Sequence, residues 1–373
     1  MKIAIYLPSL QGGGAERVSL LLAQGFVQKG AQVDLVLASA EGPHLRSVPP
    51  GVNVVDLKAR RVLMSLPPLV TYLRRRRPEV MISSLSHANV IAIFAKKIAG
   101  NDTRVFVVEH VVPTASSQLH ATTPSKLTLW LMPRVYPFAD AILAVSQGVA
   151  EELVRDFGLP REKVRLVYNP VVGDDIFAKA QQPLEHPWFK PGAPPVFLAV
   201  GRLAKEKNFG MLIRVFDRVL KNLDSRLLIL GEGQERPYLE DLVHKLGLSE
   251  YVSLPGFEIN PYRYMARASA LVLSSIHEAL PTVLIEALAL GTPVVATDCP
   301  YGPAEILEGG RWGRLVNVDD EEAMAKAMME AVVNPPSEEE KQLARESALS
   351  RFGVSEGVER YWRLIVDAER KYV

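Results

Sequence analysis

Short apolar runs alternate along the chain with segments of helical periodicity. Near the amino terminus, Lys2 to Leu7 is predicted as a strand, Val18 to Gln28 as a helix and Val33 to Ala38 as the next strand. The same half holds six further predicted elements: the strands Val54 to Leu57, Val80 to Ser83, Arg104 to Val108, Ala141 to Val145 and Val164 to Val167, and the helix Ser65 to Arg77. The order strand, helix, strand is typical of βαβ units with a parallel sheet.

The alternation restarts in the second half. Its predicted elements are the strands Val196 to Val200, Arg226 to Leu230, Val252 to Leu254, Ala270 to Leu273 and Val294 to Ala296, and the helices Arg236 to Leu246, Thr282 to Leu290, Glu321 to Val333, Ser337 to Phe352 and Ser355 to Lys371. Residues 181–195 between the halves contain five prolines, which indicates a linker.

This pattern predicts an α/β protein of two doubly wound Rossmann-like domains with a cleft between them. At 373 residues the chain exceeds what one hydrophobic core usually serves. We expect a first domain over residues 1–180, the linker 181–195, a second domain over 196–354 and a last helix over 355–373. In open α/β sheets, ligands bind at the carboxyl ends of the strands.

Composition and charge limit the classes of binding partner that the chain can have. The chain is 48% hydrophobic and 23% charged, with a formal net charge of +1, so it has no global basic field for nucleic acid. Its one cysteine, Cys299, excludes an internal disulfide and offers no metal cluster. No run approaches the roughly 18 apolar residues of a membrane span, and the first strand is too short for a signal peptide. We therefore expect a cytoplasmic protein.

A basic region in the first half has two interpretations. Its arginines are Arg60, Arg61, Arg74, Arg75, Arg76 and Arg77. Cations at the end of a helix are favourable in any protein, so the region can be an ordinary solvated face. With the apolar residues Leu63 and Met64 it can also form a surface for anionic lipid head groups on the inner face of the plasma membrane.

A glycine loop follows the first strand. Gly12 and Gly14 fit the first two positions of a dinucleotide-binding G-x-G-x-x-G pattern, but Arg17 stands where the third glycine belongs. The loop offers close backbone approach and exposed N–H groups at a helix start, which suit a phosphate or a sugar. A tight turn required by packing alone is the other interpretation.

His110 directly follows a predicted strand, at the same sheet edge as the glycine loop. A histidine there can donate a hydrogen bond to a ligand oxygen, or it can cap the loop. The residues alone leave these two roles open.

Two cations and two carboxylates stand where strands of the second half end. Arg202 and Lys207 follow one strand, and a guanidinium and an ammonium at this spacing can converge on a diphosphate. Glu278 and Glu286 follow another strand, the second of them inside a predicted helix. Solvated charges explain each pair alone; together they describe a site for a nucleotide-sugar.

Three motifs carry a resemblance to a known family. Glu278 to Glu286 has an E-x₇-E spacing, Gly201 to Asn208 resembles a G-R-x₄-K-N turn, and Gly12 to Glu16 resembles a G-G-G-A-E loop. All three resemble retaining, nucleotide-sugar-dependent glycosyltransferases of family 4 (group 1) with the GT-B fold. The similarity extends to Val145 to Leu153, Tyr168 to Pro170 and Gly231 to Gly233.

The resemblance implies roles for the second domain. Glu286 would hold the ribose hydroxyls, and Arg202 and Lys207 would stabilise the diphosphate leaving group. Glu278 would hold the donor sugar. The remaining donor-binding residues of this domain would be Gly233, Pro255, Gly256 and Phe257 near the base, and Ala279, Leu280, Pro281, Thr282 and Val283 near the sugar. Ala279 stands where many relatives have glycine, which matters if that position needs positive φ.

For the first domain, the resemblance implies contacts from Gly13 and Gly14 to the donor phosphates and sugar, and from His110 to the transferred sugar. We expect the acceptor to bind this domain through Glu16, Ser146 and Asn169. The nucleotide-sugar is a co-substrate, and neither a cofactor nor a metal is expected. The last helix is expected to cross back to this domain, as in relatives of this fold.

The resulting hypothesis is hexosyl transfer, with retention, from a UDP-sugar, or less readily a GDP-sugar, to a lipid-linked or polysaccharide acceptor in lipopolysaccharide or other cell-envelope glycan synthesis. A GT-B sugar-nucleotide epimerase, which needs no acceptor, is one alternative. A non-catalytic two-lobed sugar-binding module is another, and it would close on its ligand without turnover.

Overall fold

The computed structural model of the chain describes residues 1–11, 13–110 and 123–370. Gly12 and Lys371, which belong to predicted elements, lie outside these residues. The chain divides into two compact units: unit 1 comprises Met1–Pro170 and Val354–Val373, and unit 2 comprises Val171–Gly353. The last helix therefore belongs to the same unit as the first strand, although all of unit 2 separates them along the chain.

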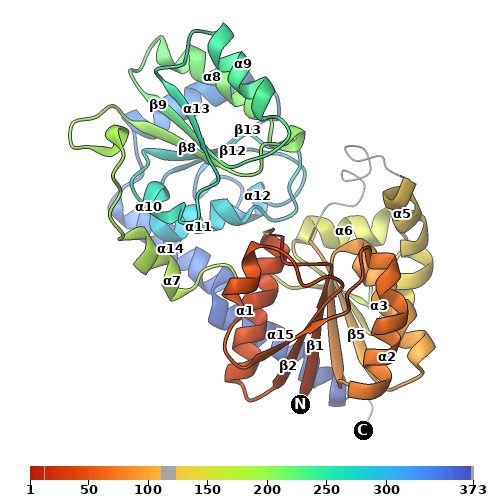
Figure 1. The fold of residues 1–373 in the computed structure, drawn as a ribbon. Coiled ribbons are helices and arrows are strands. Elements are labelled where there is room, and N and C mark those ends of the chain that lie inside the picture. Colours follow the sequence, from red (N-terminus) through yellow and green to blue (C-terminus); the bar gives the residue numbers. More distant parts are fainter. Residues whose placement is uncertain (12, 111–122, 371–373) are drawn as a thin grey trace. The chain divides into compact units, whose positions relative to one another are not determined.

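Unit 1 is built on a seven-stranded parallel sheet in the order β3-β2-β1-β4-β5-β6-β7 (Figure 1). Its strands are β1 (Lys2–Leu7), β2 (Gln32–Leu37), β3 (Val52–Asp56), β4 (Val80–Ser84), β5 (Arg104–Glu109), β6 (Ala141–Ala144) and β7 (Val164–Leu166). The strand order reverses at β1, which pairs with β2 on one side and with β4 on the other.

Helices cover both faces of this sheet (Figure 1). They are α1 (Gly14–Gln28), α2 (Leu66–Arg76), α3 (Ser86–Ala99), α5 (Thr123–Val135), α6 (Gln147–Arg155) and α15 (Val354–Arg370), with 3-10 turns η1 (Pro43–Ser47), η2 (Val62–Ser65) and η3 (Tyr136–Phe138). One layer pairs α1 with α15, and the other packs α3 against α2 and α5.

Unit 2 is built on a six-stranded parallel sheet in the order β10-β9-β8-β11-β12-β13. Its strands are β8 (Val196–Val200), β9 (Arg226–Leu230), β10 (Val252–Gly256), β11 (Ala270–Leu273), β12 (Val294–Thr297) and β13 (Arg314–Val316). Here the order reverses at β8, which pairs with β9 and β11.

The helices of unit 2 also form two layers (Figure 1). They are α7 (Asp174–Ala180), α8 (Phe209–Leu220), α9 (Arg236–Lys245), α10 (Tyr262–Met265), α11 (Thr282–Leu290), α12 (Pro303–Ile306), α13 (Glu321–Val333) and α14 (Glu338–Phe352), with 3-10 turns η4 (Pro187–Phe189) and η5 (Lys205–Lys207). One layer contains α8, α9 and α13, and the other contains α10, α11 and α14. The short helix α7 packs on α10 and α11.

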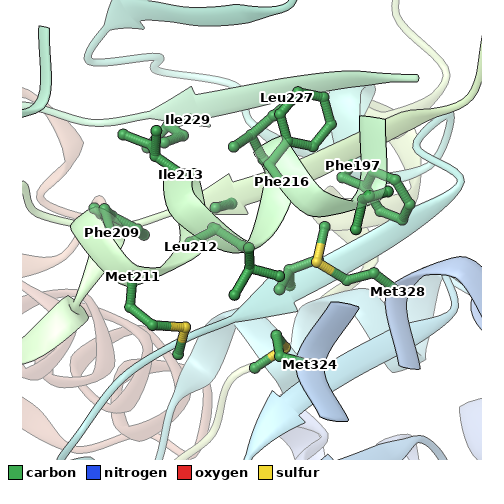
Figure 2. Close-up of a cluster of buried hydrophobic side chains, with 14 of the residues drawn as sticks. Phe197, Phe209, Met211, Leu212, Ile213, Phe216, Leu227, Ile229, Met324 and Met328 are labelled. Carbon is green, nitrogen blue, oxygen red and sulfur yellow. The ribbon is translucent and has the colours of Figure 1, made fainter. Parts of the chain in front are cut away.

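The core of unit 2 shows why its sequence folds this way. The apolar face of α8 meets β8, β9 and α13, as Figure 2 shows for Phe216, Phe197 and Met328. Phe197 and Phe216 pack edge to face, with ring centroids 6.4 Å apart. Because strands of a parallel sheet are covered on both faces, they read as continuous apolar runs in the sequence.

The expected architecture of two α/β Rossmann-like domains is confirmed. Most predicted elements are present with bounds shifted by one or two residues, and β1, β8 and β11 match their predicted ranges. Several elements were not predicted, among them the helix α3, which is apolar around most of its surface, and the three-residue strand β13, which is too short to show a period.

Candidate functional site

The loops that follow β8 and β11 meet where the strand order of unit 2 reverses. Ser274 Oγ donates to the carbonyl oxygen of Lys207 at 2.7 Å, and the Ile276 N–H donates to the carbonyl oxygen of Glu206 at 2.9 Å. These hydrogen bonds hold the two loops together at the edge of the sheet where α/β proteins bind ligands.

Lys207 and Glu278 form an ion pair between these loops. Lys207 Nζ lies 2.5 Å from Glu278 Oε1, and the two side chains are 21% and 11% exposed. Ser275 Oγ donates to the same carboxylate oxygen at 2.7 Å. Because the pair is largely shielded from solvent, salt screens it less than a surface pair. Two of the predicted site residues are thus brought together, with the carboxylate acting as a hydrogen-bond acceptor.

Arg202 has a different partner. Its Nη2 donates to Glu206 Oε1 at 2.6 Å, with the guanidinium side chain 66% exposed. Burial alone would raise the pKa of Glu206, but its backbone N–H and the Arg202 guanidinium together outweigh burial and lower that pKa. An anion that reaches this loop therefore competes with Glu206 for Arg202.

Glu286 is a buried carboxylate within α11. The side chains around it on this helix are apolar, and Glu286 itself is 3% exposed. The hydroxyl of Tyr262 donates to Glu286 Oε1 at 3.2 Å. The sequence pattern did not single out Tyr262, because it comes from the four-residue helix α10 and has no local signal of its own.

The segment before α11 resolves the question about Ala279. The residue is buried, and its φ is not positive. Positive φ occurs instead at Tyr301 (+69°) and Gly302 (+56°), in the loop after β12, and an added Cβ on Gly302 would lie 2.6 Å from Pro281 Cδ. Thr282 and Val283 stand in the first turn of α11, where a helix leaves its N–H groups without intrahelical acceptors.

The residues expected near the base lie at the ends of β9 and β10. The Gly231 N–H donates to the carbonyl oxygen of Gly256 at 2.8 Å. A Cβ on Gly233 would lie 2.3 Å from the Leu203 carbonyl oxygen, so this loop packs directly on the loop after β8. Pro255 and Phe257 are exposed, Phe257 to 71%.

In unit 1, His110 and Asn169 lie side by side. Asn169 Nδ2 is 3.4 Å from His110 Nδ1, and Ser84 Oγ is 3.3 Å from His110 Nε2. Burial lowers the pKa of His110 to about 4, so its imidazole is neutral at neutral pH. A predicted sugar-binding residue and a predicted acceptor-binding residue thus share one polar cluster.

Glu109, the residue before His110, carries a buried carboxyl that the sequence pattern did not single out as part of the site. Glu109 accepts hydrogen bonds from Ser86 at 2.8 Å and Asn89 at 2.9 Å, and also from the hydroxyl of Tyr136. Burial raises the pKa of Glu109. This network ties the end of β5 to the start of α3 and thereby supports the backbone at His110.

The other predicted residues of unit 1 have local roles as well. The Ser146 hydroxyl caps α6 by accepting from the Val149 N–H at 3.3 Å. Gly13 is the N-cap residue of α1, and Glu16 lies in the first turn. Gly14 is exposed, and an added Cβ would meet nothing within 4 Å.

Cys299 is buried. Burial, together with the negative charge of Glu278, raises the pKa of its thiol to about 12. Across the described residues, no group of three or more His, Cys, Asp and Glu side chains is placed to hold a metal ion. Within the same residues, no helix has both the length and the apolar character that a membrane crossing requires.

Two family models and several known proteins match this chain. Residues 181–348 match the family described as group 1 glycosyl transferases, and residues 12–173 match glycosyltransferase family 4. A Campylobacter jejuni N-acetylgalactosamine-N,N'-diacetylbacillosaminyl-diphospho-undecaprenol 4-alpha-N-acetylgalactosaminyltransferase is 32% identical over 88% of this chain and 89% of its own length. A Rhizobium meliloti lipopolysaccharide core biosynthesis glycosyltransferase is 26% identical over 86% of each chain.

Among solved structures, the Anabaena protein HepE in complex with UDP-glucose superposes with a TM-score of 0.79. It is 20% identical, over 98% of this chain and 100% of that chain, so this likeness concerns the fold. The sequence relatives, the two family matches and the pair of parallel-sheet units agree: the chain is a glycosyltransferase of group 1, family 4, with the GT-B fold.

Proposed function

We propose that the protein transfers a hexose, with retention of configuration, from a UDP-sugar, or less readily a GDP-sugar, to a lipid-linked or polysaccharide acceptor in cell-envelope glycan synthesis. The observation that carries this proposal is the Lys207–Glu278 ion pair at the strand ends of unit 2, with the buried Glu286 on the adjoining helix. One edge of one sheet thus offers cations for phosphates and carboxylates for hydroxyls.

The donor roles that the family resemblance implies suit the chemistry of each group. Lys207 and Arg202 bind the diphosphate, because an ammonium and a guanidinium are strong donors to phosphate oxygens. Glu278 and the first N–H groups of α11 hold the transferred sugar, and Glu286 accepts from the ribose hydroxyls. The UDP-glucose bound by the Anabaena protein supports UDP as the nucleotide.

We propose front-face attack for the transfer. The bond between the sugar and the diphosphate breaks as the acceptor hydroxyl bonds to the same face, and the acceptor proton passes to the departing diphosphate. Glu278 Oε1 already accepts from Lys207 and Ser275, which suits an orienting carboxylate more than a nucleophile. The protein contributes mainly by stabilising the leaving diphosphate with fixed charges, and no metal takes part.

The acceptor proposal rests on the named relatives. One acts on a sugar linked to diphospho-undecaprenol, and another belongs to lipopolysaccharide core biosynthesis. We propose that the acceptor binds unit 1 near the cluster of His110 and Asn169, with further contacts from Glu16 in the first turn of α1 and Ser146 at the start of α6.

Transfer assays with site variants test the proposal. Arg202→Ala and Glu286→Gln should each reduce transfer by roughly 10² to 10³ fold, whereas Lys221→Ala, which removes an exposed cation at the C-terminal end of α8, should not. Undiminished transfer by the first two variants would refute the site assignment.

The mechanism has its own tests. A product with the inverted anomeric configuration would refute retention, and loss of transfer in EDTA would refute metal independence. Turnover of UDP-GlcNAc without acceptor would favour an epimerase.

We also propose peripheral contact of unit 1 with anionic lipid on the inner face of the plasma membrane. Arg60, Arg61 and the run from Arg74 to Arg77 are all exposed. Leu63 and Met64 beside the first pair are 72% and 61% exposed, which gives an apolar contribution next to the cations.

A second exposed area of unit 1 has the same character. Trp130 and Phe138 are 56% and 58% exposed. The Arg134 guanidinium lies 4.1 Å from the Trp130 ring centroid, and Lys97 Nζ lies 4.5 Å from that of Phe138. Aromatic rings with cations beside them are typical of surfaces at a lipid interface.

Vesicle sedimentation tests this contact. Neutralising the six arginines, or replacing Trp130 and Phe138 with serine, should weaken binding to vesicles containing phosphatidylglycerol, while transfer to a water-soluble acceptor stays unchanged. Unaltered vesicle binding in both variants would contradict the proposal.

A further inference from the structure

Glu286 needs its buried carboxylate held in one orientation to act on a ligand. An isolated carboxylate at 3% exposure is costly unless hydrogen bonds satisfy it. The Tyr262 hydroxyl supplies one such bond, to Oε1. Because a carboxylate offers two oxygens and about four acceptor sites, a bond to Oε1 fixes the group and leaves capacity for further donors.

Tyr262 is itself held firmly. It is 5% exposed, and it begins α10 directly after Asn260 and Pro261. Asn260 Nδ2 donates to the carbonyl oxygen of Lys179 and to Gln182 Oε1, both at 2.9 Å. At the far end of α10, Arg267 Nη1 donates to the carbonyl oxygen of Ala180 at 2.9 Å. The segment around α7 therefore anchors the short helix that carries the tyrosine.

We infer that Tyr262 is a positioning residue for the donor: its hydroxyl orients the Glu286 carboxylate so that it accepts from the ribose hydroxyls. The inference rests on the proposed ribose role of Glu286. It adds Tyr262 of α10 as the residue that keeps the Glu286 carboxylate in position for that role. It predicts that loss of the Tyr262 hydroxyl weakens nucleotide binding by weakening the contact to the ribose, while the contacts to the base and the diphosphate stay unchanged.

Binding measurements with Tyr262→Phe test this. Calorimetry would compare UDP with 2′,3′-dideoxy-UDP, or GDP with its dideoxy form if the wild type prefers guanine. In the wild type, removal of the hydroxyls should weaken binding about tenfold or more, which corresponds to about 1.4 kcal/mol. Tyr262→Phe should weaken UDP binding about tenfold and leave binding of the dideoxy nucleotide nearly unchanged.

The matched control is Tyr264→Phe, which removes the hydroxyl of the other tyrosine on α10. It should leave the preference for ribose intact, and thermal unfolding should show all variants folded. The double variant Tyr262→Phe with Glu286→Gln should bind UDP no more weakly than Glu286→Gln alone, since both changes act on one contact.

The outcomes separate the two proposals. If the wild type binds both nucleotides equally, the ribose role of Glu286 is wrong. If the wild type prefers the ribose form but Tyr262→Phe weakens both nucleotides by the same factor, Tyr262 acts only on the structure of unit 2 and the inference is wrong. Additive effects in the double variant would also overturn it.

Discussion

At the residue scale, close backbone approach shapes the loops of unit 2. Gly231 directly follows β9 with φ +150°, and an added Cβ would lie 1.8 Å from the Gly201 carbonyl oxygen. That carbonyl belongs to the loop that goes on to Arg202 and Lys207. The glycine is therefore required by the packing of two strand ends, and a methyl group there must displace backbone.

Gly231→Ala should reduce the free energy of unfolding by about 3 kcal/mol or more, because backbone cannot move as a flexible side chain can. Gly247→Ala is the matched control: φ is +70° there, but nothing lies within 4 Å of the added Cβ. The control should cost only about 1 to 2 kcal/mol for its left-handed conformation. Urea unfolding measures both, and equal losses would contradict the clash argument.

His110 should make stability depend on pH. Its pKa is 6.5 ordinarily and about 4 in the folded protein, because burial disfavours the imidazolium. Between these values the unfolded state binds a proton that the folded state does not, so this residue's contribution is complete above pH 6.5 and is lost as pH falls toward 4.

The loss should amount to about 1 to 3 kcal/mol in the wild type and be absent from His110→Gln. Urea unfolding of both proteins at about pH 7 and about pH 5 isolates this contribution as the difference between their pH dependences. Identical dependences would mean that His110 titrates normally in the folded protein.

At the scale of elements, α15 is a structural part of unit 1. Tyr361 and Ile365 on this helix are each 1% exposed. Lys29, the C-cap residue of α1, places its Nζ 2.6 Å from Glu359 Oε2, and Arg104 of β5 donates to the Ile365 carbonyl oxygen at 2.7 Å. The helix completes the layer that α1 begins.

Gly25 on α1 should be required for this packing, since an added Cβ would lie 2.4 Å from Val358 Cγ2. Gly25→Ala should lower the melting temperature despite alanine's better helix propensity, with a net cost of about 1 to 3 kcal/mol. Gly14→Ala on the same helix has open space and should be neutral or stabilising. Val358→Ala should relieve the Gly25→Ala cost, and failure to do so would contradict the packing argument.

At the scale of the whole molecule, the chain path makes the two units unequal. Unit 2 is one continuous segment, Val171–Gly353, whereas unit 1 needs both ends of the chain. Each unit has its own sheet and core, so each can unfold as a cooperative body.

Residues 171–353 expressed alone should therefore fold and bind UDP, because the sheet, the core and the proposed nucleotide contacts of unit 2 are all within this segment. Residues 1–170 alone should be much less stable than when α15 is added back. Circular dichroism and thermal unfolding of the two fragments would check this. A fragment 171–353 that fails to fold would show that unit 2 depends on the rest of the chain.

Much of this organisation was predictable from the pattern of residues. The apolar runs located β1, β8 and β11, and parallel strands bring their carboxyl ends to one edge, so the loops with Lys207 and Glu278 were expected to meet there. The same reasoning placed His110 at the corresponding edge of the first sheet. It did not find Tyr262, which lies in a helix without a motif, nor Ser275 and Glu109, which stand close in sequence to Glu278 and His110 but carry no signal of their own.

The sequence by itself determined which segments are strands and helices and at which sheet edge the chemical groups lie, because periodicity and parallel-strand geometry are local rules. Only the tertiary structure decided the partners. Glu278 contacts Lys207, which lies 71 positions away in the sequence. The separation is 24 positions for the contact of Glu286 with Tyr262 and 59 for that of His110 with Asn169. Such pairings depend on how strands order themselves and on which rotamers the packed core permits. Physical proximity of this kind has no signature in any single stretch of the chain.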